Sequence, residues 1–215
     1  MCAYKIHNVV TDNLFKKSQC PFLIGVDEAG RGPLAGPLAV GALFVRDKSI
    51  LRRFAGVKDS KKLSEKKREE WFLKIELAEK KGLLSFEVAL LSASEIDEKG
   101  MSACLKKGVR RALRRFAREQ EYTRVLLDGT LHAPKEFIHQ TALIKGDERE
   151  RIIAMASIVA KVTRDHLMVK LAHEYPQYGF EQHKGYGTKV HYKALTRFGA
   201  SPIHRLTFLR LECGS

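Results

Sequence analysis

Short apolar runs alternate along this chain with longer stretches of helical periodicity. Five runs rich in Leu, Val, Ile and Phe have the length and composition of β-strands, and they cover residues 21–27, 38–45, 83–90, 124–128 and 138–144. Apolar residues spaced three and four apart predict helices over 64–81, much of 93–120 and roughly 148–173. The early strands follow one another like hairpins, and the later ones alternate with helices. We therefore expect a layered α/β domain with a mixed sheet.

Residues that start and stop helices mark the ends of these stretches. Ser64 and Ser92 are suited to cap helix N-termini. Glu95 stands three residues after Ser92, which is the spacing of a capping box. Gly82 is typical of the residue that follows a helix, and we expect the long third helix to end before Pro176.

The chain shows no internal division. Its 215 residues are enough to bury a sizeable core, and no repeat, low-complexity tract or linker interrupts them. We expect one domain over 21–215, preceded by a loosely patterned leader over 1–20. No apolar run approaches the ~18 residues that a membrane span needs, and the N-terminus lacks a signal core. The four cysteines are scattered, so neither a zinc knuckle nor a disulfide framework is expected. These features favour a cytoplasmic protein with no membrane partner.

The chain is strongly basic. Lys and Arg number 39 against 25 for Asp and Glu, which gives a net charge of +14 and a pI near 9.7. Such a chain attracts polyanions, and nucleic acid is the first candidate. A run without acids between 101 and 118 contains Lys106, Lys107, Arg110, Arg111, Arg114, Arg115 and Arg118. Its spacing puts much of this charge on one helix face, which either binds a polyanion or is merely solvated. A second run, Lys61, Lys62, Lys66, Lys67 and Arg68, is offset by glutamates and is expected to form a salt-bridged surface.

Acidic residues stand at the ends of three predicted strands. Asp27 and Glu28 end the first strand, Asp128 ends the fourth, and Asp147 lies just past the fifth. Because the carboxyl ends of parallel strands meet at one edge of a sheet, the four carboxylates can converge there. Taken singly, Asp128 before Gly129 is typical of a turn, and Asp147 of a helix N-cap. Together they favour Mg²⁺ or Mn²⁺, and two such ions could hold a phosphate, activate a water and stabilise a leaving oxygen.

The segment Gly30-Arg31-Gly32 follows the first acidic pair. With Gly36 it loosely imitates a dinucleotide-binding loop, but the spacing is one residue too long and Pro33 removes a backbone N–H. The segment is therefore either a flexible turn or a loop whose backbone approaches a sugar or phosphate, with Arg31 adding positive charge.

Six motifs give the chain a wider resemblance. They are GVDEAGRGPLAGP at 25–37, DSKKLS at 59–64, LLDG at 126–129, KGD at 145–147, ASIVAKVTRD at 156–165 and YGFEQHKGYGT at 178–188. In this order they resemble the bacterial ribonuclease HII family over roughly residues 22–208. The resemblance implies a ribonuclease H-like fold: a mixed five-stranded sheet flanked by helices, with a helical C-terminal part. It also implies metal-dependent cleavage of RNA in RNA–DNA hybrids and incision 5′ of ribonucleotides embedded in duplex DNA, leaving 3′-OH and 5′-phosphate ends.

The same resemblance implies roles for individual residues. Asp27, Glu28, Asp128 and Asp147 match the family's catalytic, metal-binding carboxylates. Gly30, Arg31 and Gly32 match its sensor of the ribonucleotide 2′-OH, and Tyr186 matches the residue that stacks on the neighbouring deoxyribose. Ser60, Lys61, Lys161 and Arg164 match positions that border the substrate or support the site. The alternative for Tyr186 is a core position, which its flanking glycines disfavour.

Some features depart from the family or leave alternatives open. The sequence around Gly100, Met155 in the long helix and the tail 204–208 match the family pattern only partly. The related type 3 enzymes are less similar, because they carry a Gly-Thr-Gly-like loop and a long N-terminal domain. The rival functions are a non-catalytic nucleic-acid-binding domain and a DNA endonuclease that ignores the sugar. We expect a monomer that acts on RNA–DNA hybrids and on duplex DNA containing ribonucleotides.

Overall fold

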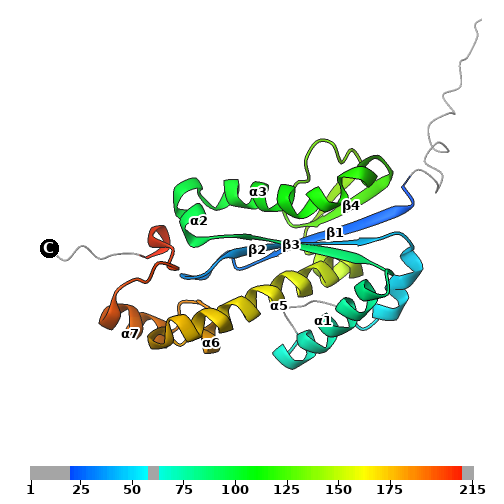
Figure 1. The fold of residues 1–215 in the computed structure, drawn as a ribbon. Coiled ribbons are helices and arrows are strands. Elements are labelled where there is room, and N and C mark those ends of the chain that lie inside the picture. Colours follow the sequence, from blue (N-terminus) through cyan, green and yellow to red (C-terminus); the bar gives the residue numbers. More distant parts are fainter. Residues whose placement is uncertain (1–19, 58–62, 210–215) are drawn as a thin grey trace, which may run out of the picture.

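A mixed five-stranded sheet forms the middle layer of the protein (Figure 1). The structure is a computed structural model that describes residues 20–57 and 63–209. The strands are β1 Phe22–Ala29, β2 Leu38–Val45, β3 Ser85–Leu91, β4 Thr123–Asp128 and β5 Gln140–Leu143, in the order β3-β2-β1-β4-β5. β2 pairs antiparallel with β1 and β3, whereas β4 pairs parallel with β1 and β5. The predicted mixed sheet is confirmed.

Helices cover both faces of this sheet (Figure 1). One face carries α1 Glu65–Lys80 and α5 Arg151–Glu174, and the other carries α2 Ala93–Lys99 and α3 Met101–Leu113. Side chains alternate along β2, so that Leu43 and Val45 join the core beneath α1 and α5. Val40 and Phe44 join the core beneath α3. The sheet is therefore buried on both sides.

The long helix α5 lies directly against the central strand. An ideal Cβ built on Gly25 of β1 would come within 2.4 Å of the Ile152 carbonyl oxygen, so any larger residue would displace the backbone of α5. This close contact positions the first turns of α5 beside the end of β1, where the acidic pair lies.

Local signals placed most helix ends correctly. The Ser64 hydroxyl accepts a hydrogen bond from the Lys67 N–H, and Ser92 and Glu95 form the predicted capping box. The helix expected over much of 93–120 is interrupted, which corrects that prediction. Gly100 adopts φ +77°, a left-handed value that favours glycine, and separates α2 from α3. Beyond α3 the chain continues as the 3₁₀ segment η3 Arg114–Tyr122.

The C-terminal part is helical, as predicted. It contains η4 Pro176–Tyr178, α6 Phe180–His183, α7 Lys189–Phe198 and η5 Leu206–Phe208. These elements gather at one end of α5 around a separate apolar cluster that includes Met168, Tyr178 and Phe180 (Figure 1). One further 3₁₀ helix, η1 Lys48–Phe54, follows β2. No helix within residues 20–57 and 63–209 is long and apolar enough to cross a membrane. The predicted leader lies outside the described residues except for Cys20.

Candidate active site

The first acidic pair lies within the last residues of β1. Asp27 faces Gly41 of β2 in the strand register, and β1 continues to Ala29. Asp27 is only 2% exposed, and its Oδ1 accepts a 2.7 Å hydrogen bond from the Glu28 N–H. The Glu28 side chain is 12% exposed. The central strand thus brings two carboxylates to one edge of the sheet with little solvent around them.

The surroundings of Asp27 disfavour its negative charge. Burial raises the pKa of the Asp27 carboxyl well above its ordinary value, and the charges of Glu28 and Asp128 raise it further. A hydrogen bond with Ser157 opposes this rise. The Asp27 Oδ2 atom is buried and accepts no hydrogen bond from any residue that the structure describes. A buried carboxylate among other carboxylates is stabilised by a cation, so the electrostatics favour a metal ion here.

Asp128 and Asp147 come together through one backbone hydrogen bond. Asp128 is the last residue of β4, and its Oδ1 accepts a 2.6 Å hydrogen bond from the Gly146 N–H. Gly146 opens the short helix α4 Gly146–Arg149, and Asp147, 2% exposed, follows it. An ideal Cβ at Gly146 would lie 2.6 Å from Ile153 Cδ1, so a larger residue here would require the Ile153 side chain to move.

The alternative role for Asp147, capping the long helix, is wrong. The residue before α4 is Lys145, and the residue before α5 is Glu150, so Asp147 caps neither helix. The helix that follows the fifth strand is divided, because α4 ends at Arg149 and α5 begins two residues later. Asp147 therefore lies in the first turn of a separate short helix beside Asp128.

A pocket of about 490 Å³ brings most of the predicted residues together. Its lining includes three of the four carboxylates and all three loop residues: Asp27, Glu28, Ala29, Gly30, Arg31, Gly32, Arg68, Asp128, Ser157, Lys161 and Tyr186. Asp147 is not in this lining. Within the described ranges, no three Asp, Glu, His or Cys side chains form a cluster that encloses an ion by itself. Carboxylate oxygens nevertheless suit Mg²⁺ or Mn²⁺, which retain water and substrate oxygens as further ligands.

The Gly30-Arg31-Gly32 loop is fixed from behind by a buried arginine. Arg205, 0% exposed, donates hydrogen bonds to the carbonyls of Gly30 at 2.7 Å, Arg31 at 3.0 Å and Gly36 at 2.9 Å. Burial lowers the pKa of Arg205 to about 10, so the guanidinium is charged at neutral pH. On the outer side, Arg31 Nη1 lies 3.2 Å from Glu28 Oε1. These bonds show a held loop, which argues against a flexible turn.

Arg164 is a second buried guanidinium behind the same loop. It is 0% exposed and donates to the carbonyls of Pro37 at 2.9 Å, Ala35 at 3.2 Å and Lys184 at 3.0 Å. An ideal Cβ at Gly30 would lie 2.2 Å from Arg164 Nε. Of the two roles open to Arg164, this location corresponds to support of the site.

Lys161 and Tyr186 form the opposite wall of the pocket. Lys161 Nζ lies 2.6 Å from Asp165 Oδ1 and 5.8 Å from the centre of the Tyr186 ring. Burial lowers the pKa of Lys161, and its bond to Asp165 opposes that change. Tyr186 is 41% exposed, so the core alternative for this residue is wrong. Its loop is anchored, because the Gly185 carbonyl accepts a 2.8 Å hydrogen bond from Leu34.

Three residues, two in the pocket lining and one behind it, do not stand out in the sequence as individual site candidates. The sequence predicts Arg68 within a salt-bridged surface, but the residue lines the pocket. Ser157 stands one helical turn before Lys161, and this i, i+4 spacing on α5 was a usable signal. Arg205 gave no local signal, because its partners are about 170 residues away in the chain. Ser60 and Lys61 lie outside the described residues.

Comparisons with known proteins agree on one family. The family model of ribonuclease HII matches residues 24–211. Ribonuclease HII of Caldicellulosiruptor bescii is 42% identical over 189 residues, which cover 88% of this chain and 87% of the relative. Ribonuclease HII of Coxiella burnetii is 42% identical over 199 residues, with 92% and 93% covered.

Solved structures of ribonucleases H are also similar to the chain. Ribonuclease H2 from Pyrococcus horikoshii matches with a TM-score of 0.66 and 32% identity, covering 86% of this chain and 93% of that one. The structure of the PCNA:RNase HII complex from Archaeoglobus fulgidus matches with a TM-score of 0.70 and 28% identity, with 90% and 96% covered. Bst-RNase HIII in complex with Mn²⁺, at 20% identity and a TM-score of 0.61, shares the fold over 84% of this chain and 70% of its own.

Proposed function

We propose a specific substrate and cleavage position for this chain, which belongs to the ribonuclease HII family and is a ribonuclease H. It hydrolyses RNA in RNA–DNA hybrids and cuts duplex DNA on the 5′ side of embedded ribonucleotides, leaving 3′-OH and 5′-phosphate ends. The observation that carries this proposal is a single pocket shared by three carboxylates, the Gly30–Gly32 backbone and the exposed ring of Tyr186.

The carboxylates are assigned to divalent metal ions, Mg²⁺ or Mn²⁺. Asp27, Glu28, Asp128 and Asp147 would hold these ions. The buried Oδ2 of Asp27 and the mutual repulsion of the acids support the assignment, as does the Mn²⁺ complex of Bst-RNase HIII. Bound ions of this kind supply an activated water and neutralise charge at a phosphate. The chain's own contribution is to orient the ligands, and the Gly146 N–H does so for Asp128.

We assign the Gly30-Arg31-Gly32 loop and Tyr186 to recognition of the two sugars at the junction. The carbonyls of Gly30 and Arg31 already accept hydrogen bonds from Arg205. We therefore assign the N–H groups of this loop to the ribonucleotide 2′-OH. The Tyr186 ring lines the same pocket and would pack flat against the deoxyribose on the DNA side of the junction. Lys161 and Arg68 add positive charge to the pocket and are assigned to nearby backbone phosphates.

Mapped cleavage of a duplex with one embedded ribonucleotide tests this function. We expect a single cut 5′ of the ribonucleotide with Mg²⁺ and with Mn²⁺, no cut in excess EDTA, and an intact all-DNA duplex. Asp27→Asn is the matched inactive control. Binding without cleavage under either metal would identify a non-catalytic binding domain, and cleavage of the all-DNA duplex would identify an endonuclease that ignores the sugar.

The oligomeric state and location form part of the same proposal. We propose a monomer that acts in the cytoplasm, and light scattering of the protein with and without duplex checks its mass.

A further inference from the structure

The basic segment 101–118 carries its charge in two rows with different partners. In the first row, Lys107 and Arg111 both contact Glu95, at 2.5 Å and 3.3 Å. Arg115, one turn further on, lies 3.3 Å from Glu79 and donates to the Phe86 carbonyl. The segment itself contains no acid, but acids from α1 and α2 neutralise this row. The predicted basic face is therefore divided into two rows, and acids from other elements pair with this one.

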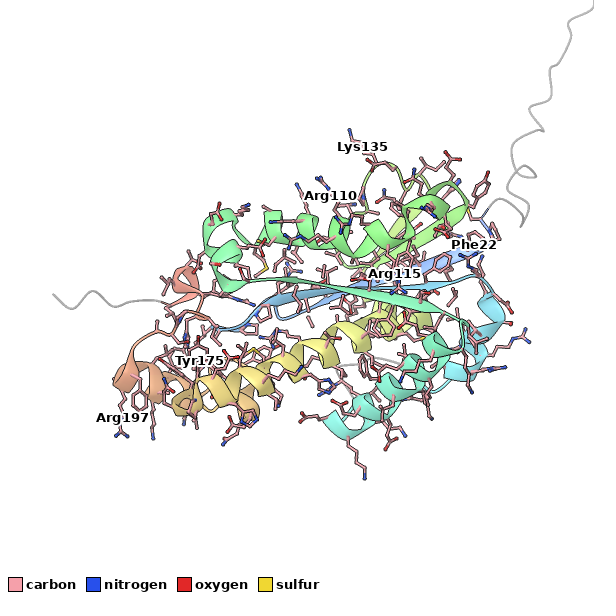
Figure 2. The ribbon with its side chains drawn as sticks, in the orientation of Figure 1. Phe22, Arg110, Arg115, Lys135, Tyr175 and Arg197 are labelled. Atoms are coloured by element: carbon pink, nitrogen blue, oxygen red, sulfur yellow. The ribbon has the colours of Figure 1, made fainter. Side chains whose placement is uncertain are left out.

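The second row has no such partners. Lys106, Arg110 and Arg114 repeat the same four-residue spacing and are exposed. Among the residues that the structure describes, no acid lies within ion-pair distance of any of the three. They form one wall of a groove of about 650 Å³, whose other wall is the segment 132–137 with Lys135. Figure 2 shows Arg110 and Lys135 projecting at the same edge of the molecule, whereas Arg115 lies toward the sheet.

The composition of the groove decides what kind of partner fits it. Its apolar floor includes Leu113 and Phe137, which are 0% and 3% exposed and belong to the core below. Little of their surface is left for an apolar anchor of a docking helix to cover. The rim carries Lys106, Arg110, Arg114 and Lys135 against the single acid Glu136. A partner recognised by repeated negative charge fits this groove better than one recognised by apolar side chains.

We propose that this groove binds the phosphodiester backbone of the duplex at a distance from the cleavage pocket. The proposal rests on the proposed function, because it supplies a second contact for the same nucleic acid. Residues 106 to 114 of a helix span about 12 Å at 1.5 Å per residue. One DNA strand presents a phosphate about every 3.4 Å along its axis, so the row covers three or four phosphates.

The groove also adjoins the cleavage pocket along the chain. Asp128 lines the pocket, and His132, four residues later, lines the groove. Four residues reach at most about 14 Å, so the two sites lie within the reach of one duplex. A duplex held in the pocket can therefore extend onto the cationic row.

A length series of duplexes, each with one ribonucleotide, tests the proposal. The lengths run from about 10 to about 30 base pairs, roughly 34 to 102 Å at 3.4 Å per pair, extended on either side of the ribonucleotide. The test variant is Lys106→Gln/Arg110→Gln/Arg114→Gln. The control is Arg53→Gln/Lys80→Gln/Lys81→Gln, which removes the same charge from exposed cations of η1 and α1 on the other face of the sheet. Fluorescence anisotropy in EDTA gives Kd, and a thermal melt checks each fold.

We expect the affinity of the wild type and the control to rise once the duplex reaches the groove. The test variant should lack that gain, and its slope of log K against log salt should fall by about 2 to 3, at 0.9 per lost phosphate contact. Cleavage of the shortest duplex should be equal in all three proteins.

The two proposals fail in different ways. If no protein cuts a duplex of any length in the series, the proposed function fails, while the anisotropy series still decides the groove. If the test variant keeps the gain with length and the salt slope of the control, the groove does not bind the duplex. In that outcome an acidic protein segment becomes the occupant to test.

Discussion

The side chains assigned to the candidate site differ sharply in how much of their surface is exposed. Asp27 and Asp147 are each 2% exposed, whereas Tyr186 is 41% exposed. Asp128 lies between these extremes and uses one oxygen for the Gly146 N–H. Substitutions that preserve this bond, or that shorten an exposed ring, test function with little effect on the fold.

Asp128→Asn should nearly abolish cleavage and leave the fold intact. The asparagine oxygen can still accept the hydrogen bond from Gly146, but the charge that would bind metal is lost. We expect kcat to fall by about 10²–10³-fold or more, as for loss of a charge-stabilising group. Steady-state kinetics at saturating Mg²⁺ and a thermal melt measure the two effects. Near wild-type activity would remove Asp128 from the site.

Tyr186→Ala should impair cutting at an isolated ribonucleotide more than cutting within a continuous RNA strand. The exposed ring is proposed to recognise the deoxyribose, which only the first substrate presents on the DNA side of the junction. kcat/KM on both substrates measures the difference. Tyr186→Phe keeps the ring and should behave as the wild type. Equal losses on the two substrates would refute the role in reading the junction.

Some candidate site residues can be predicted from the sequence and others cannot. The difference is whether the signal lies in neighbouring residues or in partners that are distant along the chain. Asp27, Glu28 and Asp128 were found because each lies near a strand end, which is a local pattern. The sequence around Arg68 is typical of a charged surface helix. Only the tertiary fold brings this residue to the pocket. Arg205 was invisible for the same reason, since nothing nearby in the chain reveals the carbonyls that it binds.

At the scale of elements, the C-terminal tail and the loop after β1 act as one unit. Arg205 precedes η5 and joins this tail to three carbonyls around Gly30, Arg31 and Gly36. A chain of rings connects the same tail to the Tyr186 loop. The Ser201 N–H donates to His204 Nδ1, His204 Nε2 lies 2.9 Å from His191 Nε2, and His191 Nδ1 lies 2.9 Å from the Tyr186 carbonyl. The Arg205 bonds position the Gly30-Arg31-Gly32 loop, and the histidine chain positions Tyr186.

Arg205→Met should weaken recognition of the ribonucleotide. Each hydrogen bond from a charged donor contributes about 1.5–3 kcal/mol, so stability should also fall. The measurement specific to positioning compares two affinities: that for a duplex with one ribonucleotide, divided by that for the all-DNA duplex. Both are measured in EDTA, below the melting temperature of the variant. We expect this ratio to fall, and Arg205→Lys, which keeps the charge, to restore it in part. A lower melting temperature with an unchanged ratio would assign Arg205 to stability alone.

The histidine chain predicts a loss of stability in mild acid. Burial lowers the pKa of His204 to about 4, and the neighbouring His191 adds to the effect. The unfolded chain, with an ordinary histidine pKa near 6.5, therefore binds the proton first as pH falls. The contribution of neutral His204 is complete above about pH 6.5 and is lost progressively toward pH 4, by at most about 3 kcal/mol.

Urea unfolding between pH 7 and pH 5 measures this dependence. The titratable groups that face His204 are His191 and Tyr178, and His183 stacks on His191. His204→Asn should show a shallower fall in unfolding free energy over this range than the wild type. Equal slopes would show that another group causes the fall.

At the scale of the whole molecule, pattern and topology were predictable to different degrees. Short apolar runs predict the five strands, and capping residues predict the ends of α1, because those features are local. The interruption at Gly100 was missed, since apolar periodicity continues from α2 into α3 on both sides of it. The division of the basic charge into two rows was also hidden. It depends on Glu79 and Glu95, which the fold brings in from other elements.

The strand order has a consequence for the time course of folding. β1 and β2 are neighbours in sequence, so their hairpin closes through local contacts, whereas β1 and β4 join across about a hundred residues. Closing a loop of that length costs about 4 kcal/mol of chain entropy, and such distant pairings form slowly. The pocket needs this pairing, because Asp27 comes from one strand and Asp128 from the other. A chain still emerging from the ribosome can pair β1 with β2 long before it has an active site, and recovery of activity during refolding reports the arrival of β4.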